Sequence, residues 1–302
     1  MAKFDYEEKI MPTAKLPNKQ KSKAEILANM GKLENKRPFF KGTIFGLPGT
    51  GKTITAFEIA QALATEEKPG IIYVDTAENW ASTLNHPELQ KNVMRFPYTT
   101  YDDLLVLANF IHTGEPPFDK IGSIIIDEYN SYVEHDLNWI TMIRSQQAEA
   151  NKKDFRDPFW PQLPDYMSAQ NRSNVFIDGL MRLNVNVLAV AHAAKDKDTY
   201  WMTVDMSAGA RKGLMRKMHV VAYAEKNDKV KGPPQFTLRL SPLVSGKIEA
   251  KGRIGNLGDV ATTKQVIEAY KNWGVKTPVL EVEEETPALP KNETIDLLSE
   301  IN

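Results

Sequence analysis

Short, continuous apolar runs alternate along this chain with longer stretches in which apolar residues recur every three or four positions. Each run has the length and composition of a strand that is buried on both faces of a parallel sheet. The runs lie at 39–45, 70–75, 121–127 and 185–191, and a shorter one lies at 93–96. They predict the strands of a central sheet.

The periodic stretches predict helices between these strands. Apolar residues over 56–63 would share one face of a helix. A Thr-x-x-Asp pattern at 100–103 is typical of a capping box at the start of the next helix. Further helices are predicted at about 131–150 and 166–183, and a last one over 266–273 would stop at Gly274.

Shorter strands are predicted near 218–225, 235–240 and 247–251, close enough in sequence to form an antiparallel addition at one sheet edge. Strands that alternate with helices of this length imply right-handed βαβ units. The expected fold is therefore α/β, with a mostly parallel sheet covered by helices on both faces and short antiparallel strands added near the C-terminus. Ligands of such sheets bind outside the carboxyl ends of the strands.

Composition narrows the chemistry. The 302 residues suit one principal domain, and the chain has no cysteine, which excludes disulfides, thiolate zinc sites and cysteine nucleophiles. The five histidines lack the spacing of a structural metal site. Because no apolar run has the length of a signal peptide core or a membrane span, we expect a cytoplasmic protein without a membrane partner.

The strongest motif follows the first predicted strand, where residues 46–53 read GLPGTGKT, a complete G-x-x-x-x-G-K-T phosphate-binding loop. Its glycines allow successive N–H groups to turn toward a phosphate at the positive end of the following helix. Lys52 would neutralise β- and γ-phosphate charge, and the Thr53 hydroxyl would ligate Mg²⁺. The sequence therefore predicts a site for a magnesium-bound nucleoside triphosphate. The loop consists of Gly46, Leu47, Pro48, Gly49, Thr50, Gly51, Lys52 and Thr53.

Acidic residues after the other strands would complete this site. Asp127 ends an apolar strand, which is the position expected for the acid that holds the magnesium hydration shell opposite Thr53. Hydrolysis also needs a base for the attacking water, and Glu128 and Glu78 are both candidates. His192 follows the strand at 185–191, where it would either sense the γ-phosphate or make an ordinary hydrogen bond.

Lys251 and Arg253 are the last candidate site residues. Alternate side chains of a strand share a face, so both cations would point to the same side of an edge strand. There they could reach the γ-phosphate held by a neighbouring subunit, as an arginine finger does. The alternative is a basic edge strand that prevents aggregation.

Together these motifs resemble the RecA-like P-loop ATPase superfamily, which includes RecA, KaiC and DnaB-type hexameric helicases. The resemblance covers about residues 38–256 and is greatest to phage-encoded RecA-like single-strand annealing or recombination ATPases. It implies ATP as the nucleotide and a homo-oligomer, as a ring or filament, in which Lys251 and Arg253 act in trans. It also implies that Asp127 holds the magnesium shell and that His192 is the sensor.

Two features depart from the RecA-like pattern. The glutamate that usually stands two residues after the acid of the second strand is replaced by Ala77, and Glu78 follows it. The residue after the magnesium-binding acid is usually small, whereas here it is Glu128, as in the AAA+ pattern. The sequence thus leaves the identity of the catalytic base open.

In RecA-like proteins the loops after the magnesium strand and the sensor strand face single-stranded DNA. The matching segments, 151–166 and 195–217, interleave cations with aromatic residues, which suits phosphate tracking and base stacking, or else a packed surface loop or a subunit contact. These residues are Lys152, Lys153, Phe155, Arg156, Phe159, Trp160 and Tyr166 in the first segment and Tyr200, Trp201, Arg211, Lys212, Arg216 and Lys217 in the second.

The sequence therefore predicts a DNA-stimulated ATPase domain at 38–275, between a basic arm at 1–37 and an acidic tail at 276–302. Its expected function is to act on single-stranded DNA in phage-type recombination or replication, in the host cytoplasm if the protein is phage-encoded. Two alternatives stay open. One is a nucleotide-gated assembly or regulatory ATPase that acts on a protein partner, and the other is a hexameric helicase or helicase loader.

Overall fold

The structure is a computed structural model, and it describes most of the chain from Arg37 to Trp273. Glu78, residues 1–36 of the predicted arm and all residues from 274 on, including the predicted tail at 276–302, lie outside the described residues. The described ranges are 37–76, 83, 86–98, 100–151, 156–226, 236–243, 247–254 and 257–273.

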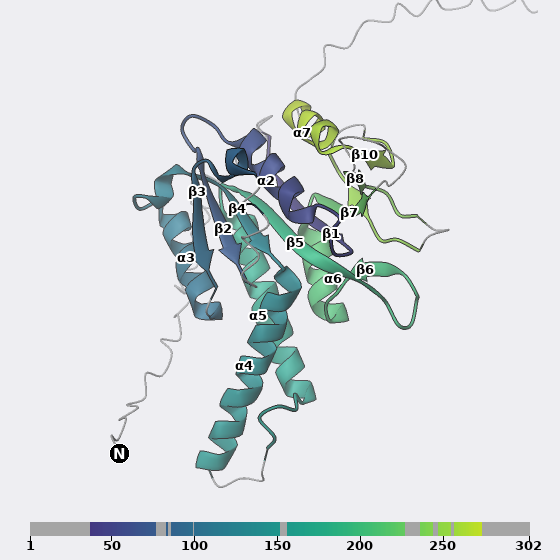
Figure 1. The fold of residues 1–302 in the computed structure, drawn as a ribbon. Coiled ribbons are helices and arrows are strands. Elements are labelled where there is room, and N and C mark those ends of the chain that lie inside the picture. The colour runs from purple at the N-terminus through teal and green to yellow at the C-terminus, as the bar shows by residue number, and fades with distance from the viewer. Residues whose placement is uncertain are drawn as a thin grey trace, which may run out of the picture. The chain divides into compact units, whose positions relative to one another are not determined.

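Parallel strands form the centre of one sheet in the order β7-β1-β5-β4-β2-β3 (Figure 1). All residues of β1, β2 and β4 are buried, as the continuous apolar runs predict. The fold class expected from the sequence is confirmed. The parallel strands are β1 (Lys41–Gly46), β2 (Gly70–Asp75), β3 (Val93–Pro97), β4 (Ile121–Asp127), β5 (Asn186–Lys195) and β7 (Val220–Lys226).

Short antiparallel strands extend this sheet. β8 (Phe236–Arg239) pairs with the end of β7, and β10 (Val260–Ala261) pairs with β8 at the outer edge. β9 (Lys251–Gly252) pairs with the start of β7, and β6 (Met202–Val204) folds back on the end of β5. The antiparallel addition near the C-terminus is therefore present.

Two details of the sequence prediction are wrong. The segment at 218–225 was expected to be antiparallel, but β7 runs parallel to β1 because the short helix α6 (Ala208–Lys217) returns the chain to the same sheet end. The hydrophobic pattern does not reveal α6, because two of its positions that face α5 are glycines. A Cβ atom at Gly209 or Gly213 would clash with α5 side chains. His192 was expected to end its strand, but β5 continues to Lys195, where β6 pairs with it.

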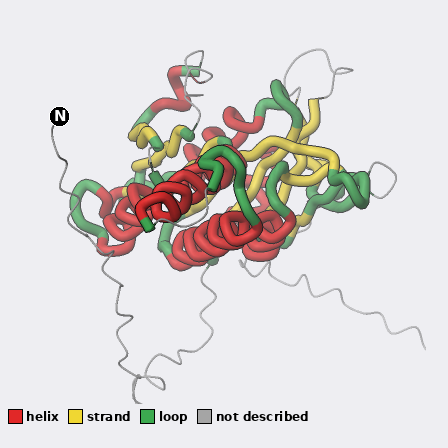
Figure 2. The backbone as a smooth tube through the Cα atoms, turned by 90° about the horizontal axis from the view of Figure 1, so that it is seen from below, coloured by secondary structure: helices red, strands yellow, loops and turns green. Residues whose placement is uncertain are grey.

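Helices cover both faces of the sheet (Figures 1 and 2). α2 and α7 pack on one face, and α3, α4, α5 and α6 pack on the other, each layer with its own apolar core. The capping box predicted at Thr100 and Asp103 is present at the start of α3. The remaining helices are α2 (Lys52–Leu63), α3 (Tyr101–Thr113), α4 (Tyr129–Ala150), α5 (Leu163–Arg182), α7 (Thr263–Asn272), η2 (Pro87–Gln90) and η3 (Phe118–Lys120).

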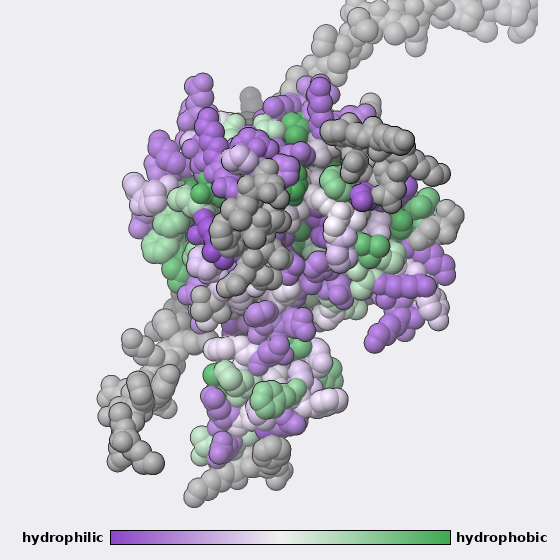
Figure 3. Space-filling model, in the orientation of Figure 1, coloured by the Kyte–Doolittle hydropathy of each residue, from purple (hydrophilic) through white to green (hydrophobic). Residues whose placement is uncertain are grey.

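α4 and α5 pack against each other as a helical hairpin that extends beyond the sheet (Figure 1). At 1.5 Å per residue, a helix of 22 residues such as α4 is about 33 Å long. Hydrophobic residues are visible on the surface of this hairpin (Figure 3). Phe159 and Trp160, before the start of α5, are 89% and 74% exposed, so these two rings do not pack against the rest of the described structure.

Candidate active site

The phosphate-binding loop connects β1 to α2 in the conformation that its glycines allow. Gly49 and Gly51 have φ angles of 75° and 74°, in the left-handed region that favours glycine. Gly51 is also the N-cap residue of α2, so the loop amides meet the positive end of that helix. The buried Lys52 ammonium lies 2.9 Å from the Leu47 carbonyl oxygen, at the loop itself.

Burial lowers the pKa of Lys52, while the negative charges of Asp127 and Glu128 oppose that shift. A desolvated ammonium group favours a ligand that restores its charge balance. The triphosphate predicted from the sequence is such a ligand. The loop amides and this cation therefore fit a nucleoside triphosphate.

Asp127 stands opposite the loop at the end of β4. Its carboxylate is 1% exposed and accepts hydrogen bonds from the Thr53 hydroxyl at 3.1 Å and from the Tyr73 hydroxyl at 2.7 Å. Burial raises the pKa of Asp127, and the bonds from Tyr73 and Thr53 oppose that shift. A hydroxyl and a carboxylate oxygen are the donor types that Mg²⁺ uses when substrate phosphates and water complete its coordination.

No group of three or more metal-ligating acids or histidines occurs within the described part of the chain. A magnesium ion at this site would be held by Thr53 and by the shell around Asp127, together with nucleotide phosphates.

Glu128 and His192 meet beside Asp127. The Glu128 Oε1 atom lies 2.9 Å from the His192 Nε2 atom, and the Ser131 hydroxyl donates to the other carboxylate oxygen at 3.2 Å. Glu128 adopts a left-handed backbone conformation with φ 48°, at the N-cap of α4. This uncommon conformation for a non-glycine residue aims the side chain toward β5 instead of continuing the strand direction.

The parallel register explains why residues so far apart in sequence meet here. Gly46 pairs with His192 across β1 and β5, and Asp75 pairs with Asp127 across β2 and β4. The loop, the acids and the histidine therefore lie together at the carboxyl ends of the parallel strands, as the sequence predicts. Asp75 is occupied by an ion pair of 2.8 Å with Arg95.

Comparison with known protein families identifies the domain that carries this site. The family described as AAA domain matches residues 39–273, which is most of the chain. The chain belongs to the AAA domain family. A search of curated proteins found none that matches it. The family supports nucleotide binding and ATPase activity, typically with Mg²⁺.

Several side chains of this AAA domain site could not be identified from the sequence. Tyr73 looks like an ordinary core residue of β2, yet its hydroxyl binds Asp127. The Thr76 hydroxyl donates to the Asp127 carbonyl oxygen at 2.6 Å, and the Asn130 side chain accepts from the His192 backbone N–H. Thr76 directly follows β2, and a polar residue at that position is a usable signal, whereas Asn130 is the second residue of α4, three positions after the end of β4. Nothing in the sequence pattern marks Tyr73.

Phe236, the first residue of β8, is a further residue that the sequence did not indicate. A Cβ atom added at Gly51 would lie 2.7–2.9 Å from atoms of the Phe236 ring. The ring therefore packs directly on the phosphate-binding loop and requires glycine at position 51. This contact joins the antiparallel addition to the nucleotide site.

Lys251 and Arg253 lie far from this site within the same chain. Gly252 pairs with Val220 at the start of β7, whereas the phosphate-binding loop follows Gly46, which pairs with Ala224. At about 3.3 Å per residue, four residues of β7 separate the two positions by about 13 Å along the strand. Arg253 is therefore placed away from its own loop, at the amino-terminal end of β7.

The same two cations share a cavity of about 390 Å³ beside α6. The Lys251 ammonium donates to backbone carbonyl oxygens at the end of α6, and burial, with a smaller effect of Arg253, lowers the pKa of Lys251 to about 8. The Arg253 side chain is exposed. The other cations that line this cavity are Arg211, Lys212 and Arg216.

The two segments compared with DNA-facing loops differ from one another. Lys152, Lys153 and Phe155 lie outside the described residues. Arg156 is paired with the buried Asp165, whereas Lys212 and Arg216 are exposed on α6. The described part of the first segment thus exposes mainly aromatic rings, whereas the second exposes cations together with the ring of Tyr200.

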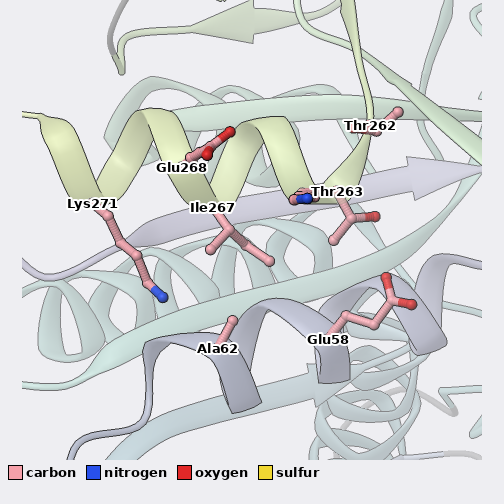
Figure 4. A pocket seen from close by; sticks show the side chains of 8 residues that line it. Glu58, Ala62, Thr262, Thr263, Ile267, Glu268 and Lys271 are labelled. Carbon is pink, nitrogen blue, oxygen red and sulfur yellow. The ribbon is translucent and has the colours of Figure 1, made fainter.

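A groove between α2 and α7 has a volume of about 640 Å³ (Figure 4). It touches α2 only at Glu58 and Ala62, beyond the phosphate end of that helix, so it is separate from the nucleotide site. In the described structure, no helix has both the length and the apolar character needed to cross a membrane.

Proposed function

We propose that this protein is an oligomeric Mg-ATP hydrolase that handles single-stranded DNA in phage-type recombination or replication. The observation that supports the ATPase part is that five polar residues meet at the carboxyl ends of the parallel strands. They are Lys52, Thr53, Asp127, Glu128 and His192. The membership in the AAA domain family supports the same conclusion.

The residues suggest a division of roles. The loop amides and Lys52 would bind and orient the triphosphate, and Thr53 with Asp127 would position Mg²⁺, which reduces the charge on the phosphates. Glu128 would accept the proton of the attacking water, and its hydrogen bond to His192 would keep its carboxylate oriented. This arrangement favours Glu128 as the base, with Glu78 as the competing candidate.

The exposed cations of α6 support the DNA part of the proposal. Lys212 and Arg216 face solvent beside Arg253, so a phosphodiester strand could contact several positive charges at once. Exposed rings such as Phe159 and Trp160 suit base stacking. The trans role of Arg253 is part of the same proposal, because its position requires the nucleotide of another copy.

An ATPase assay on size-fractionated protein, with and without single-stranded DNA, tests the proposal. We expect DNA to stimulate hydrolysis, Lys52→Ala to abolish it, and DNA affinity to fall steeply as salt rises. Replacing Lys212 and Arg216 by serine should weaken DNA binding while DNA-independent hydrolysis persists. Lys264→Ser on α7 is the matched control. Normal hydrolysis by Lys52→Ala would contradict the site, and indifference to DNA would contradict only the partner.

A second function is favoured by one specific observation. Arg156 is neutralised by Asp165, and the exposed residues around it are largely apolar, which suits a protein contact better than a phosphate contact. The alternative is therefore a nucleotide-gated ATPase that acts on a protein partner. It predicts slow hydrolysis at a rate that DNA does not change. Replacement of Phe159 and Trp160 by serine should abolish binding of the protein partner. Directional strand separation would instead identify a helicase.

A further inference from the structure

A second polar pocket, of about 210 Å³, lies on the side of the sheet that α3, α4 and α5 cover. It is separate from the phosphate-binding loop, and none of the residues assigned to the nucleotide site lines it. Its residues come from the end of β3, the start of α3 and the second and third turns of α4. They are Tyr98, Thr100, Tyr101, His135, Asp136 and Trp139.

Asp136 is the buried acid of this pocket, and among the described residues one of its oxygens has a partner and the other has none. Its side chain is 2% exposed, and Oδ1 accepts from Arg172 of α5 at 3.0 Å. Its Oδ2 atom is buried without a hydrogen-bond partner among the described residues, as is the nearby Tyr132 hydroxyl. A buried carboxylate oxygen without a donor costs free energy, so the position favours a ligand that donates a hydrogen bond.

The walls of the pocket favour a cation. Arg172 already lies 4.0 Å from the ring centre of Tyr101 and 5.1 Å from that of Trp139, in cation–π contact with both. Tyr98 packs edge-on against the His135 ring. Aromatic faces attract cations electrostatically, and they do so more strongly when the cation is removed from water.

The charge balance points in the same direction. Asp102 on α3 and Asp136 on α4 lie 3.9 Å and 3.0 Å from a single guanidinium group, that of Arg172, so these described groups leave an excess of negative charge. Burial raises the pKa of Asp136 to about 6, and Arg172 opposes that shift. Asp136 is therefore mainly ionised at neutral pH and acts as an acceptor only.

We propose that this pocket, the Asp136 cage, binds the cationic end of an arginine or lysine side chain, or a free amine of the same chemistry. The cation would donate to Asp136 Oδ2 and lie between the rings of Tyr98 and Trp139. The cage volume is below the roughly 300–1,000 Å³ of pockets that enclose drug-sized ligands, so it suits one side-chain end.

Amide-resolved NMR of the full-length protein tests this proposal with n-butylguanidinium as the probe and n-butylurea as its neutral isostere. We expect the cation to give saturable shifts at the Trp139 indole and around Thr100, with a Kd on the order of 1 mM, and the urea to give none. Asp136→Asn keeps an acceptor for Arg172 and should bind at least tenfold more weakly. Glu134→Gln, an exposed carboxylate on the same helix, should bind as the wild type does.

Three outcomes would overturn the proposal: equal binding of the urea, unchanged binding by Asp136→Asn, or no saturable shift in the wild type, which would mean that the pocket holds only water. Trp139→Leu keeps the carboxylate and covers the case in which Asp136→Asn does not fold. It should weaken binding several-fold, and undiminished affinity would also refute the cage.

Sedimentation distinguishes the sources of the cation. Self-association that n-butylguanidinium reverses in the wild type, and that Asp136→Asn lacks, would assign the occupant to a second copy of this chain. Binding of the probe with unchanged association would assign it to a free amine or to another protein.

Discussion

At the residue scale, Lys41 is a buried cation held by backbone groups. Its side chain is 3% exposed, and its ammonium group donates to the carbonyl oxygens of Leu180, Leu183 and Val185 at 2.8–3.0 Å. It therefore joins β1 to the end of α5 and to the start of the strand that follows. Burial lowers the pKa of Lys41 to about 7.

Lys41→Met should make the free energy of unfolding less dependent on pH. In the unfolded chain Lys41 titrates at its ordinary pKa of 10.5, so below about pH 7 both states are protonated and the folded state bears the desolvation cost. Between pH 7 and 10.5 the folded state loses its proton first. The wild type should therefore gain about 1–3 kcal/mol relative to the variant from pH 6 to pH 9.

Urea unfolding at the two pH values measures this difference. Lys41→Met should also be less stable at pH 9, by about 2–4 kcal/mol, because the buried carbonyl oxygens lose the two N–H donors that the neutral Lys41 amine keeps at this pH. Lys264→Met, at an exposed position, is the control and should show neither effect. A constant difference between wild type and Lys41→Met at both pH values would show that Lys41 does not titrate in this range.

Glu128 and His192 form the contact that decides the catalytic base. Glu128→Gln keeps the shape of the side chain and its bond to Ser131 but removes the proton acceptor, so kcat should fall by about 10²-fold or more while nucleotide binding persists. His192→Ala should add little to that loss, because the two residues act as one unit. Steady-state kinetics of the double-mutant cycle provides the measurement.

Glu78→Gln and Glu134→Gln complete that experiment. Glu134 is exposed on α4, so Glu134→Gln should leave kcat unchanged. If Glu78→Gln abolishes hydrolysis and Glu128→Gln retains most of it, the base is Glu78 and the pair at Glu128 only positions other groups.

At the element scale, Asp165 ties the α4–α5 hairpin together. It is fully buried and accepts from Arg144 at 2.8 Å, from Arg156 and from the Gln162 backbone N–H. Burial opposes ionisation, but the bonds from Gln162, Arg156 and Arg144 outweigh it and hold the pKa of Asp165 below its usual range. The carboxylate thus connects the body of α4 to the loop and the first turn of α5.

Asp165→Asn should destabilise the hairpin, because two guanidinium groups lose their charged partner. Breaking one side of a buried ion pair costs about 3–5 kcal/mol. We expect faster hydrogen exchange over the ends of α4 and α5, with the sheet unaffected. Asp178→Asn removes an exposed pair with Lys217 and should cost less than about 1 kcal/mol. Equal exchange in Asp165→Asn and the wild type would show that apolar packing alone holds the hairpin.

The elements also show where sequence reasoning succeeds. The bounds of β2 and β4 agree with the predicted runs, because a strand buried on both faces must be apolar throughout. α6 was missed because it buries only Ala210 and Leu214, so its pattern is weak. The contact between Glu128 and His192 depends on a left-handed backbone at Glu128, and residue spacing carries no information about that angle.

At the scale of the whole molecule, the nucleotide site and Arg253 lie at opposite ends of β7. Gly46, at the start of the loop, pairs with Ala224, whereas Gly252, the residue before Arg253, pairs with Val220. A cation at that end can meet a phosphate only if another copy presents its loop there. The proposed trans arrangement therefore predicts that hydrolysis requires contact between two subunits, one of which contributes the phosphate-binding loop and the other Arg253.

Mixing two inactive variants tests this arrangement. Lys52→Ala lacks a working loop but keeps Arg253, and Arg253→Ala keeps the loop but lacks the trans cation. In a random equal mixture, about a quarter of the contacts pair an intact loop with an intact Arg253, so about a quarter of the wild-type rate should return. Lys264→Ala in place of Arg253→Ala is the control, and it should be active before mixing. If sedimentation shows mixed oligomers without recovered hydrolysis, or if Arg253→Ala is active alone, Arg253 does not act across the contact.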